Sequence, residues 1–256
     1  MDGKEILKFV KTHGGEMFNE NFLGVYPVNK LKNIIPEIET KTYPFCIFNT
    51  DIEKESGTHW CATHILNTDR PSVFLFDSFG KLGLKTFFID DDANIIKQFI
   101  DNYNEVNDDL NKDTEAIDFY KMRVDCNKYM TLSSKNTSEL SDTLKGFMNM
   151  LMSYLRYNNR VTNRKNTCIT IFGLSDKLQN IEYTTCGLYV IYYGYNLFNP
   201  HECFDFTNEI GDLKTVKELI NNIFAESSLV NLEILKLFKD TFGIQVNLKD
   251  KSLLES

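Results

Sequence analysis

The stretch that decides the fold is residues 184–198, TTCGLYVIYYGYNLF. A polar lead-in that starts at Ser175 ends in a Cys-Gly pair, after which apolar residues follow almost without a break. Periodicity alone does not separate a helix from a buried strand here, but the run is longer than a usual strand, which favours a helix. The pattern therefore predicts a buried helix that begins at Cys186.

A thiol at the first position of a helix stands where a thiolate is favoured. The unpaired backbone N–H groups and the positive end of the helix dipole stabilise the anion. Gly187 lets another backbone come close to the sulfur, and we therefore interpret Cys186 as a candidate nucleophile. Most lone cysteines are small core residues, so this interpretation depends on what the rest of the chain supplies.

The composition is that of an ordinary globular protein, with 42% hydrophobic and 25% charged residues among 256. The net charge of −8 gives no indication of a strongly basic surface for nucleic acid. No secretory signal and no apolar run long enough to cross a bilayer can be recognised, so we expect an intracellular protein without a membrane partner. Six scattered cysteines without a Cys-x-x-Cys pair predict reduced thiols and no metal site.

The order of the expected elements favours an α+β fold in a single domain over residues 1–256. Strands are expected at residues 43–49, 58–66, 72–77 and 167–173, and the short polar loop between the second and third favours an antiparallel hairpin. Helices are expected at residues 3–10, 29–35 (ended by Pro36), 93–103, 139–157, 213–224 and 229–238. Residues 22–27 are typical of a turn-rich segment, and the acidic residues 104–115 of a loop.

Three further residues fit the needs of a nucleophilic thiol, which are a base, a group that orients the base, and donors for an oxyanion. Alternation puts His59 and His64 on opposite faces of their strand, so only one of them can face the site. We choose His59 as the candidate base, because the neighbouring Trp60 could shield its imidazole from water and restrain the ring. Asp77 ends the partner strand and can orient the imidazole. Gln179 can fold back to help the Cys186 N–H hold the oxyanion. Taken singly, each has a common structural alternative, namely a structural or surface histidine, a turn aspartate or an exposed glutamine.

In their joint order these residues resemble the adenovirus-type maturation protease (adenain) family, including relatives in virophages and Maverick/Polinton-like elements. The resemblance rests on GTHW at 57–60, LFDSFG at 75–80, CIT at 168–170, and Gln179 followed by CGL at 186–188. It covers roughly residues 18–200. The segment at about 90–166 has no counterpart in the family, so we expect an insertion there.

The resemblance implies a papain-like fold, with a mixed, mainly antiparallel central sheet flanked by helices and the nucleophile at a helix N-terminus. It implies a cysteine endopeptidase that cleaves viral capsid and other precursor polypeptides during virion maturation, after small residues such as Gly. His59, Asp77, Gln179 and Cys186 would take the roles argued above. We expect a monomer that acts in the host cytoplasm or nucleus, in the virus factory, and that is packaged in the virion.

Two features concern the placement within this family. Asp77 stands where adenoviral members have Glu, and aspartate is the form seen in the related SUMO-specific proteases. Adenoviral members are also stimulated by DNA and by a peptide that joins, through a disulfide, the cysteine at the position of Cys168. An activating peptide or DNA is therefore the cofactor that the resemblance suggests, although the acidic total does not favour DNA, and Cys168 has an equal alternative as a plain strand residue.

Three other functions stay open on the sequence. The first is a ubiquitin- or SUMO-like-specific isopeptidase of the same fold, because the site residues would be the same. The second is an inactive relative that only binds a partner, although a decayed site usually loses one of its four roles. The third is acyl transfer by the same thiol.

Overall fold

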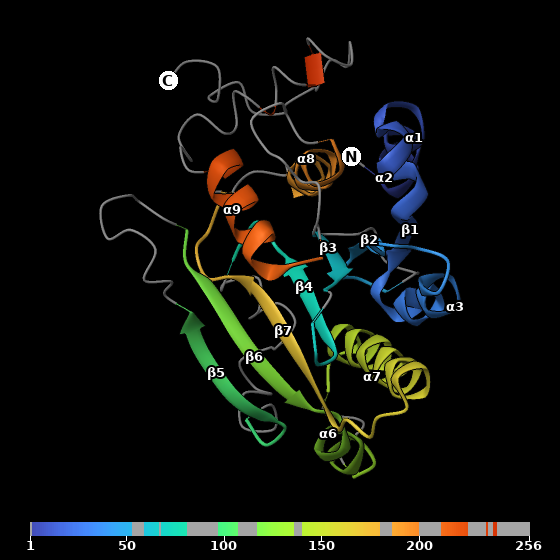
Figure 1. Ribbon diagram of the computed structural model, residues 1–256, viewed down its shortest axis with the longest axis vertical. Coiled ribbons are helices and arrows are strands. Elements are labelled where there is room, and N and C mark those ends of the chain that lie inside the picture. The colour runs from blue at the N-terminus through green and yellow to red at the C-terminus, as the bar shows by residue number, and fades with distance from the viewer. Residues whose placement is uncertain are drawn as a thin grey trace.

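In the computed structural model the chain builds one seven-stranded sheet with helices packed on both faces (Figure 1). The structure describes residues 2–52, 59–66, 68–80, 97–106, 117–135, 140–179, 186–199, 211–224, 234 and 238–239. Over these residues the architecture is α+β with a mixed sheet, as the sequence predicts.

The sheet is mixed and mainly antiparallel, with strand order β1-β2-β3-β4-β7-β6-β5. The strands are β1 (Phe22–Pro27), β2 (Phe45–Asn49), β3 (Trp60–Ile65), β4 (Ser72–Phe76), β5 (Ile100–Val106), β6 (Phe119–Asp125) and β7 (Cys168–Leu174). Four of the six neighbouring pairs are antiparallel, and the β1–β2 and β4–β7 pairs are parallel. Because β4 and β7 run the same way, the residues that follow them leave the sheet at the same end.

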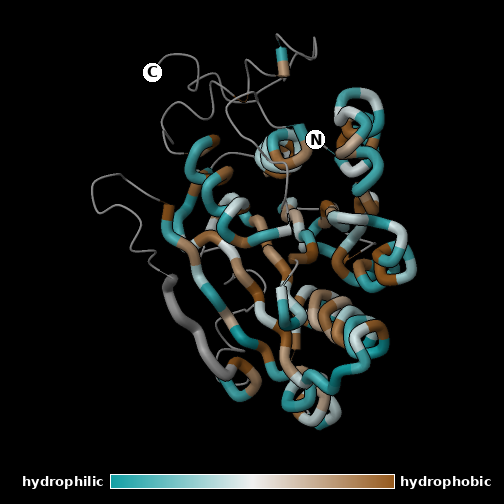
Figure 2. Tube along the Cα trace, viewed as in Figure 1, coloured by the Kyte–Doolittle hydropathy of each residue, from teal (hydrophilic) through white to brown (hydrophobic). Residues whose placement is uncertain are grey.

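Each face of the sheet carries its own hydrophobic core. Of the described helices, α1 (Gly3–His13), α2 (Gly15–Asn21), α8 (Cys186–Phe198) and α9 (Leu213–Phe224) cover one face. The other face is covered by the 3-10 helix η1 (Val28–Ile34) and by α3 (Ile35–Ile38), α6 (Cys126–Ser133) and α7 (Asp142–Thr162). Hydrophilic and hydrophobic residues alternate along α1 and α9, so that one side of each helix faces the core (Figure 2).

The helix predicted from the apolar run is α8, and it is buried around almost its whole circumference. Gly194 lets it approach the neighbouring aromatic side chains, because a Cβ at this position would lie 2.6 Å from the Phe18 ring and 2.9 Å from that of Phe45. Cys186 is the first residue of α8. The predicted helix is therefore confirmed from Cys186 onward, and residues 180–185 lie outside the described residues.

Two turn signals in the N-terminal part were misread. Residues 22–27 form strand β1, because Gly24, a residue typical of turns, is accommodated within the strand at a register shift with φ of +122°. Pro36 does not end a helix. It lies in the first turn of α3, where its missing N–H costs no hydrogen bond.

The helix expected at residues 93–103 is also wrong over the part that the structure describes. Residues 97–99 form a turn, and β5 begins at Ile100 and pairs antiparallel with β6. Of the acidic segment expected to be a loop, residues 104–106 belong to β5 and residues 107–115 lie outside the described residues. Most of the helix expected at residues 229–238 lies outside them as well.

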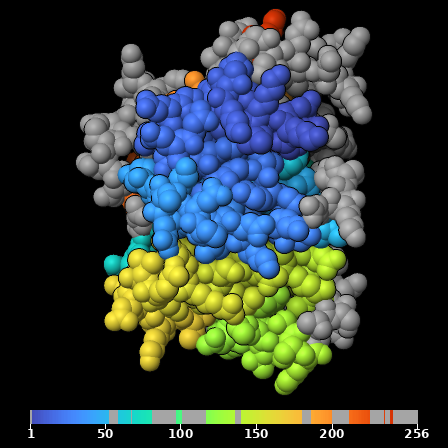
Figure 3. Space-filling view, turned by 90° about the vertical axis from the view of Figure 1, so that its right-hand side faces the viewer, coloured from blue at the N-terminus to red at the C-terminus, as the bar shows by residue number. Residues whose placement is uncertain are grey.

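The segment expected to be an insertion contributes to the main fold. It supplies β6, which pairs with β7, and α7, which was predicted at residues 139–157 and packs against η1. Figure 3 shows the N-terminal part (blue) and this segment (green to yellow) side by side on one face of the molecule. That it is an insertion relative to the adenain family stays a prediction. Among the described helices, none has the length and apolar character that crossing a membrane requires.

Candidate active site

The β3–β4 hairpin places the first two candidate residues side by side. His59 comes directly before β3 and Asp77 directly after β4, and the two strands are antiparallel, so both residues lie at the same end of the sheet. When the register of the hairpin is continued past its end, Cys61 stands opposite Asp77 and His59 stands opposite Phe79. All four side chains therefore meet at one place.

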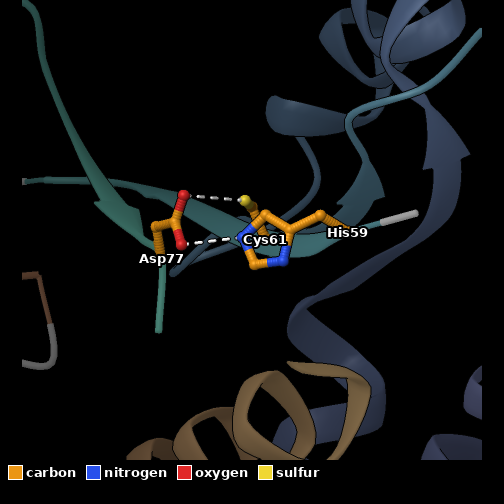
Figure 4. Close-up of side chains that lie close together, drawn as sticks. All are labelled: His59, Cys61 and Asp77. Carbon is orange, nitrogen blue, oxygen red and sulfur yellow. Dashed lines mark hydrogen bonds and ion pairs between the residues drawn. The ribbon is translucent and has the colours of Figure 1, made fainter. Parts of the chain in front are cut away.

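Asp77 holds the imidazole through a short, buried hydrogen bond. Nε2 of His59 lies 2.8 Å from Oδ1 of Asp77, and each residue is only 3% exposed (Figure 4). The same oxygen accepts the backbone N–H of Phe79 at 2.9 Å. Cys61 Sγ donates to Oδ2 at 3.5 Å. The carboxylate is therefore held at both oxygens, and the nitrogen of His59 that remains for another partner is Nδ1.

Burial and hydrogen bonding act in opposite directions on His59. Burial lowers the pKa of its imidazole, but the interaction with Cys61 and hydrogen bonds with Asp77 and Cys186 outweigh burial and raise that pKa above its ordinary value. We attribute the rise to the Asp77 carboxylate, because Cys61 is a neutral thiol at pH 7: burial raises the pKa of Cys61 to about 12. The site therefore favours an imidazolium, the form that pairs with a thiolate in thiol enzymes.

Cys186 reaches the imidazole from a different element. It is the first residue of α8, which packs on β3, and it is 6% exposed. The interaction of its thiol with His59 is among those that raise the pKa of the ring, which makes the two side chains neighbours. Asp77 holds Nε2, and Nδ1 has no hydrogen-bond partner among the described residues, so Nδ1 is the nitrogen left to interact with the sulfur.

Phe79 restrains the imidazole through one of its faces. The rings of His59 and Phe79 stack with centroids 4.3 Å apart and an angle of 11° between their planes. A stacked pair of this kind contributes about 0.5–1.5 kcal/mol beyond the area it buries. The ring is thus held at its edge by Asp77 and at its face by Phe79, which keeps Nδ1 in a constant direction.

Gln179 is brought to the site by two segments that dock at the ends of β4 and β7. The Ser78 carbonyl accepts the backbone N–H groups of Leu178 at 2.9 Å and of Gln179 at 3.0 Å. The Ser78 hydroxyl donates to Oε1 of Gln179 at 2.7 Å, and Gln179 is 1% exposed. Gly80 permits this docking, because its φ is +57° and a Cβ there would lie 2.0 Å from the Asp176 carbonyl oxygen. With its oxygen bonded to Ser78, the amide of Gln179 acts as a donor only through its N–H₂ group.

His59, Cys61 and Asp77 also form a group of potential metal ligands, with ligand atoms within 4.8 Å of one another. Tetrahedral zinc, with bonds of about 2.0–2.2 Å to nitrogen and oxygen, would hold such atoms about 3.3 Å apart. The 2.8 Å between Nε2 and Oδ1 is instead an ordinary hydrogen-bond distance. Metal binding would also require the proton of the buried Cys61 thiol to leave. The geometry therefore fits a hydrogen-bonded network better than an ion site.

His64 lies away from the His59–Asp77 cluster, on the face of the sheet that α8 covers. It is 2% exposed, lies against Phe74 with ring centroids 5.4 Å apart, and has Nδ1 3.3 Å from the Tyr193 hydroxyl. Burial lowers its pKa to about 3, so it is neutral at pH 7. The choice of His59 over His64 agrees with this placement.

Cys168 lies apart from the cluster. It is the first residue of β7, half-buried, with its sulfur 3.6 Å from the Thr167 hydroxyl. Gln179 follows the opposite end of the same strand, which at about 3.3 Å per residue puts roughly 20 Å of strand between them. The role of Cys168 as an anchor for an activating peptide stays a prediction.

The structure thus brings His59, Asp77 and Cys186 together and docks Gln179 beside Asp77 through Ser78. Sequence reasoning missed Cys61, Ser78 and Phe79. The hairpin register would have found Cys61 and Phe79, since each faces a candidate residue across the hairpin. Ser78 gave no signal of its own, because its contact with Gln179 joins residues 101 positions apart in the chain.

No protein-family model matches the chain, and no curated protein matches it either. The resemblance to the adenain-type proteases therefore stays a prediction from the motifs in the sequence.

Proposed function

We propose that this protein is a cysteine endopeptidase of the adenovirus maturation type, with His59, Asp77, Gln179 and Cys186 as its active site. The observation that carries the proposal is the 2.8 Å bond between buried His59 and Asp77, next to a cysteine that begins a helix. Cys186 and His59 were proposed from separate stretches of the sequence, so their approach in the fold supports the proposal.

The proposed reaction begins when Nδ1 of His59 takes the proton of Cys186, while Asp77 stabilises the resulting imidazolium. The thiolate attacks the peptide carbonyl carbon, and the carbonyl π electrons move onto the oxygen. When the tetrahedral intermediate collapses, the C–N bond breaks and the imidazolium gives its proton to the leaving amine. A water molecule, deprotonated by His59, then hydrolyses the thioester and restores the thiol.

The oxyanion is held by two donors. The backbone N–H of Cys186 lies at the N-terminus of α8, where no intrahelical acceptor uses it. The second donor is the side-chain amide of Gln179, whose orientation the Ser78 hydroxyl sets. Loss of one such donor typically lowers kcat by about a hundredfold to a thousandfold.

The substrate class follows from the resemblance. The substrates are viral capsid or other precursor polypeptides, cut after small residues such as Gly during virion maturation, in the host cell and in the particle. The same resemblance suggests that a peptide or DNA activates the enzyme, with the peptide anchored at Cys168. The chain's net charge of −8 favours the peptide over DNA.

The test uses quenched fluorescent peptides with Gly before the scissile bond, compared with peptides that carry Lys or Phe there. We expect the wild-type protein to prefer the Gly peptides and the Cys186→Ala variant to be inactive. The matched control is Cys46→Ala, which removes a buried thiol that contacts the backbone carbonyls of Gly24 and Ile47. Cleavage at the wild-type rate by Cys186→Ala would show that another group is the nucleophile.

A second candidate, a ubiquitin- or SUMO-like-specific isopeptidase, is favoured by one feature, the aspartate at position 77. The Asp77 side chain reaches His59 at 2.8 Å, so an aspartate is long enough to orient the imidazole here. Fluorogenic ubiquitin-like substrates, assayed beside the Gly peptides, separate the two. Preferential hydrolysis of the ubiquitin-like substrates would support the isopeptidase.

A further inference from the structure

The proposed mechanism assigns no role to Cys61, the buried thiol of the cluster. Cys61 lies on β3, two residues after His59 and on the same side of the strand, and it is 0% exposed. Its sulfur is 3.5 Å from Oδ2 of Asp77 (Figure 4). We propose that Cys61 is a positioning residue, whose S–H fixes the carboxylate of Asp77 so that the other oxygen stays on His59.

The contact between Cys61 and Asp77 follows from the register of the β3–β4 hairpin. Cys61 and Asp77 face each other across the continued β3–β4 register, and the pairing of Cys61 with Phe48 on β2 holds the strand on its other side. Backbone pairing on both sides of the strand therefore fixes the Cα and Cβ atoms of Cys61 opposite Asp77, and its rotamer brings the sulfur to the carboxylate.

The carboxylate needs this second anchor. The terminal torsion of an aspartate is broad and roughly two-fold, so a carboxylate held at one oxygen can swing. Oδ1 accepts from His59 and from the Phe79 N–H, and among the described residues Cys61 is the donor to Oδ2. Because burial keeps the Cys61 thiol protonated at pH 7, it acts there as a donor and not as a second negative charge.

The expected effect of Cys61 on kcat rests on the proposed function, whereas its contact with Asp77 does not. A hydrogen bond to a charged group contributes about 1.5–3 kcal/mol, and sulfur is a weak donor, so the low end applies. In Cys61→Ala we expect kcat about tenfold lower, which corresponds to about 1.4 kcal/mol, with KM unchanged. Cys61→Ser, which keeps a donor, should retain a kcat close to that of the wild-type protein.

A readout that needs no substrate separates the two proposals. In NMR spectra of the full chain labelled at histidine nitrogen, the proton shared by Nε2 of His59 and Asp77 should appear far downfield. We expect its signal to shift or broaden in Cys61→Ala and in Cys61→Val, which fills the space without a donor, and to persist in Cys61→Ser. Cys46→Ala, the loss of an equally buried thiol on the neighbouring strand, should leave it in place.

The outcomes divide clearly. An unchanged signal in both Cys61→Ala and Cys61→Val would overturn the positioning role, whatever the enzyme assay shows. If Cys61→Ala fails to fold, the comparison of Cys61→Ser with Cys61→Val decides in the same way. If the signal responds as expected but the wild-type protein cleaves no peptide, the positioning role stands and the proposed function fails.

Discussion

Removal of the Ser78 hydroxyl should lower the catalytic rate without weakening substrate binding. Ser78 is fully buried and donates to Oε1 of Gln179 at 2.7 Å. In Ser78→Ala that oxygen loses its donor, which for a buried group costs about 1–3 kcal/mol. The amide can recover part of this by turning over, which moves its N–H₂ end away from the oxyanion. We therefore expect kcat to fall roughly fivefold to a hundredfold, with KM little changed.

A double-mutant cycle tests this reasoning with purified variants and one Gly-containing fluorogenic peptide. Gln179→Ala should lower kcat by about a hundredfold to a thousandfold, and adding Ser78→Ala to it should cost little more, because the amide that Ser78 orients is gone. The matched control is Ser72→Ala, a buried serine at the far end of β4 that bonds the Arg70 carbonyl. Full additivity of the two losses would refute the idea that Ser78 acts through Gln179.

Three further predictions follow from the same contacts. Gly80→Ala should lower both the free energy of unfolding and kcat, because its Cβ would clash with the Asp176 carbonyl at a φ of +57°. Urea denaturation and peptide hydrolysis measure the two quantities, and wild-type values for both would contradict the docking of this turn. The buried His64 has its pKa lowered from 6.5 to about 3, so the unfolded chain binds the extra proton and stability falls as pH drops from 6.5 towards 3. His64→Gln should flatten that decline in urea unfolding, and an unchanged slope would exclude His64 as its cause. Iodoacetamide should label Cys186 before Cys61, because Cys61 is fully buried and protonated. Peptide mass spectrometry measures the order of labelling, and faster labelling of Cys61 would indicate that Cys186 is not the reactive thiol.

Much of the site was predictable because it depends on local signals. The helix that begins at Cys186 follows from the length of an apolar run, and the approach of His59 to Asp77 follows from one antiparallel hairpin. Alternation separates His59 from His64 but leaves open which of them faces the site, and the end of the hairpin decides it, because His59 and Asp77 both lie there. Each of these inferences uses neighbours in the chain or a single turn.

The remainder of the fold depends on pairings between distant segments. β5 and β6 carry charged residues such as Lys121 and Arg123, and they become strands because β7 offers an edge with which β6 can pair. The turn at Gly80 docks on a segment about a hundred residues away in the chain. No local sequence pattern therefore indicates that the Ser78 hydroxyl orients the Gln179 amide. The hydrophobic periodicity of one segment does not predict which distant segment it pairs with or in which register.

The central claim, that Cys186 is a nucleophile served by His59, is tested most directly by trapping the acyl-enzyme. The protein would be mixed with a Gly-containing peptide ester, quenched in acid within the first turnover, and digested for mass spectrometry. We predict a thioester on Cys186, which is lost in Cys186→Ala and strongly reduced in His59→Ala. Cleavage that proceeds with no adduct on Cys186, or with the adduct on another cysteine, would contradict the account.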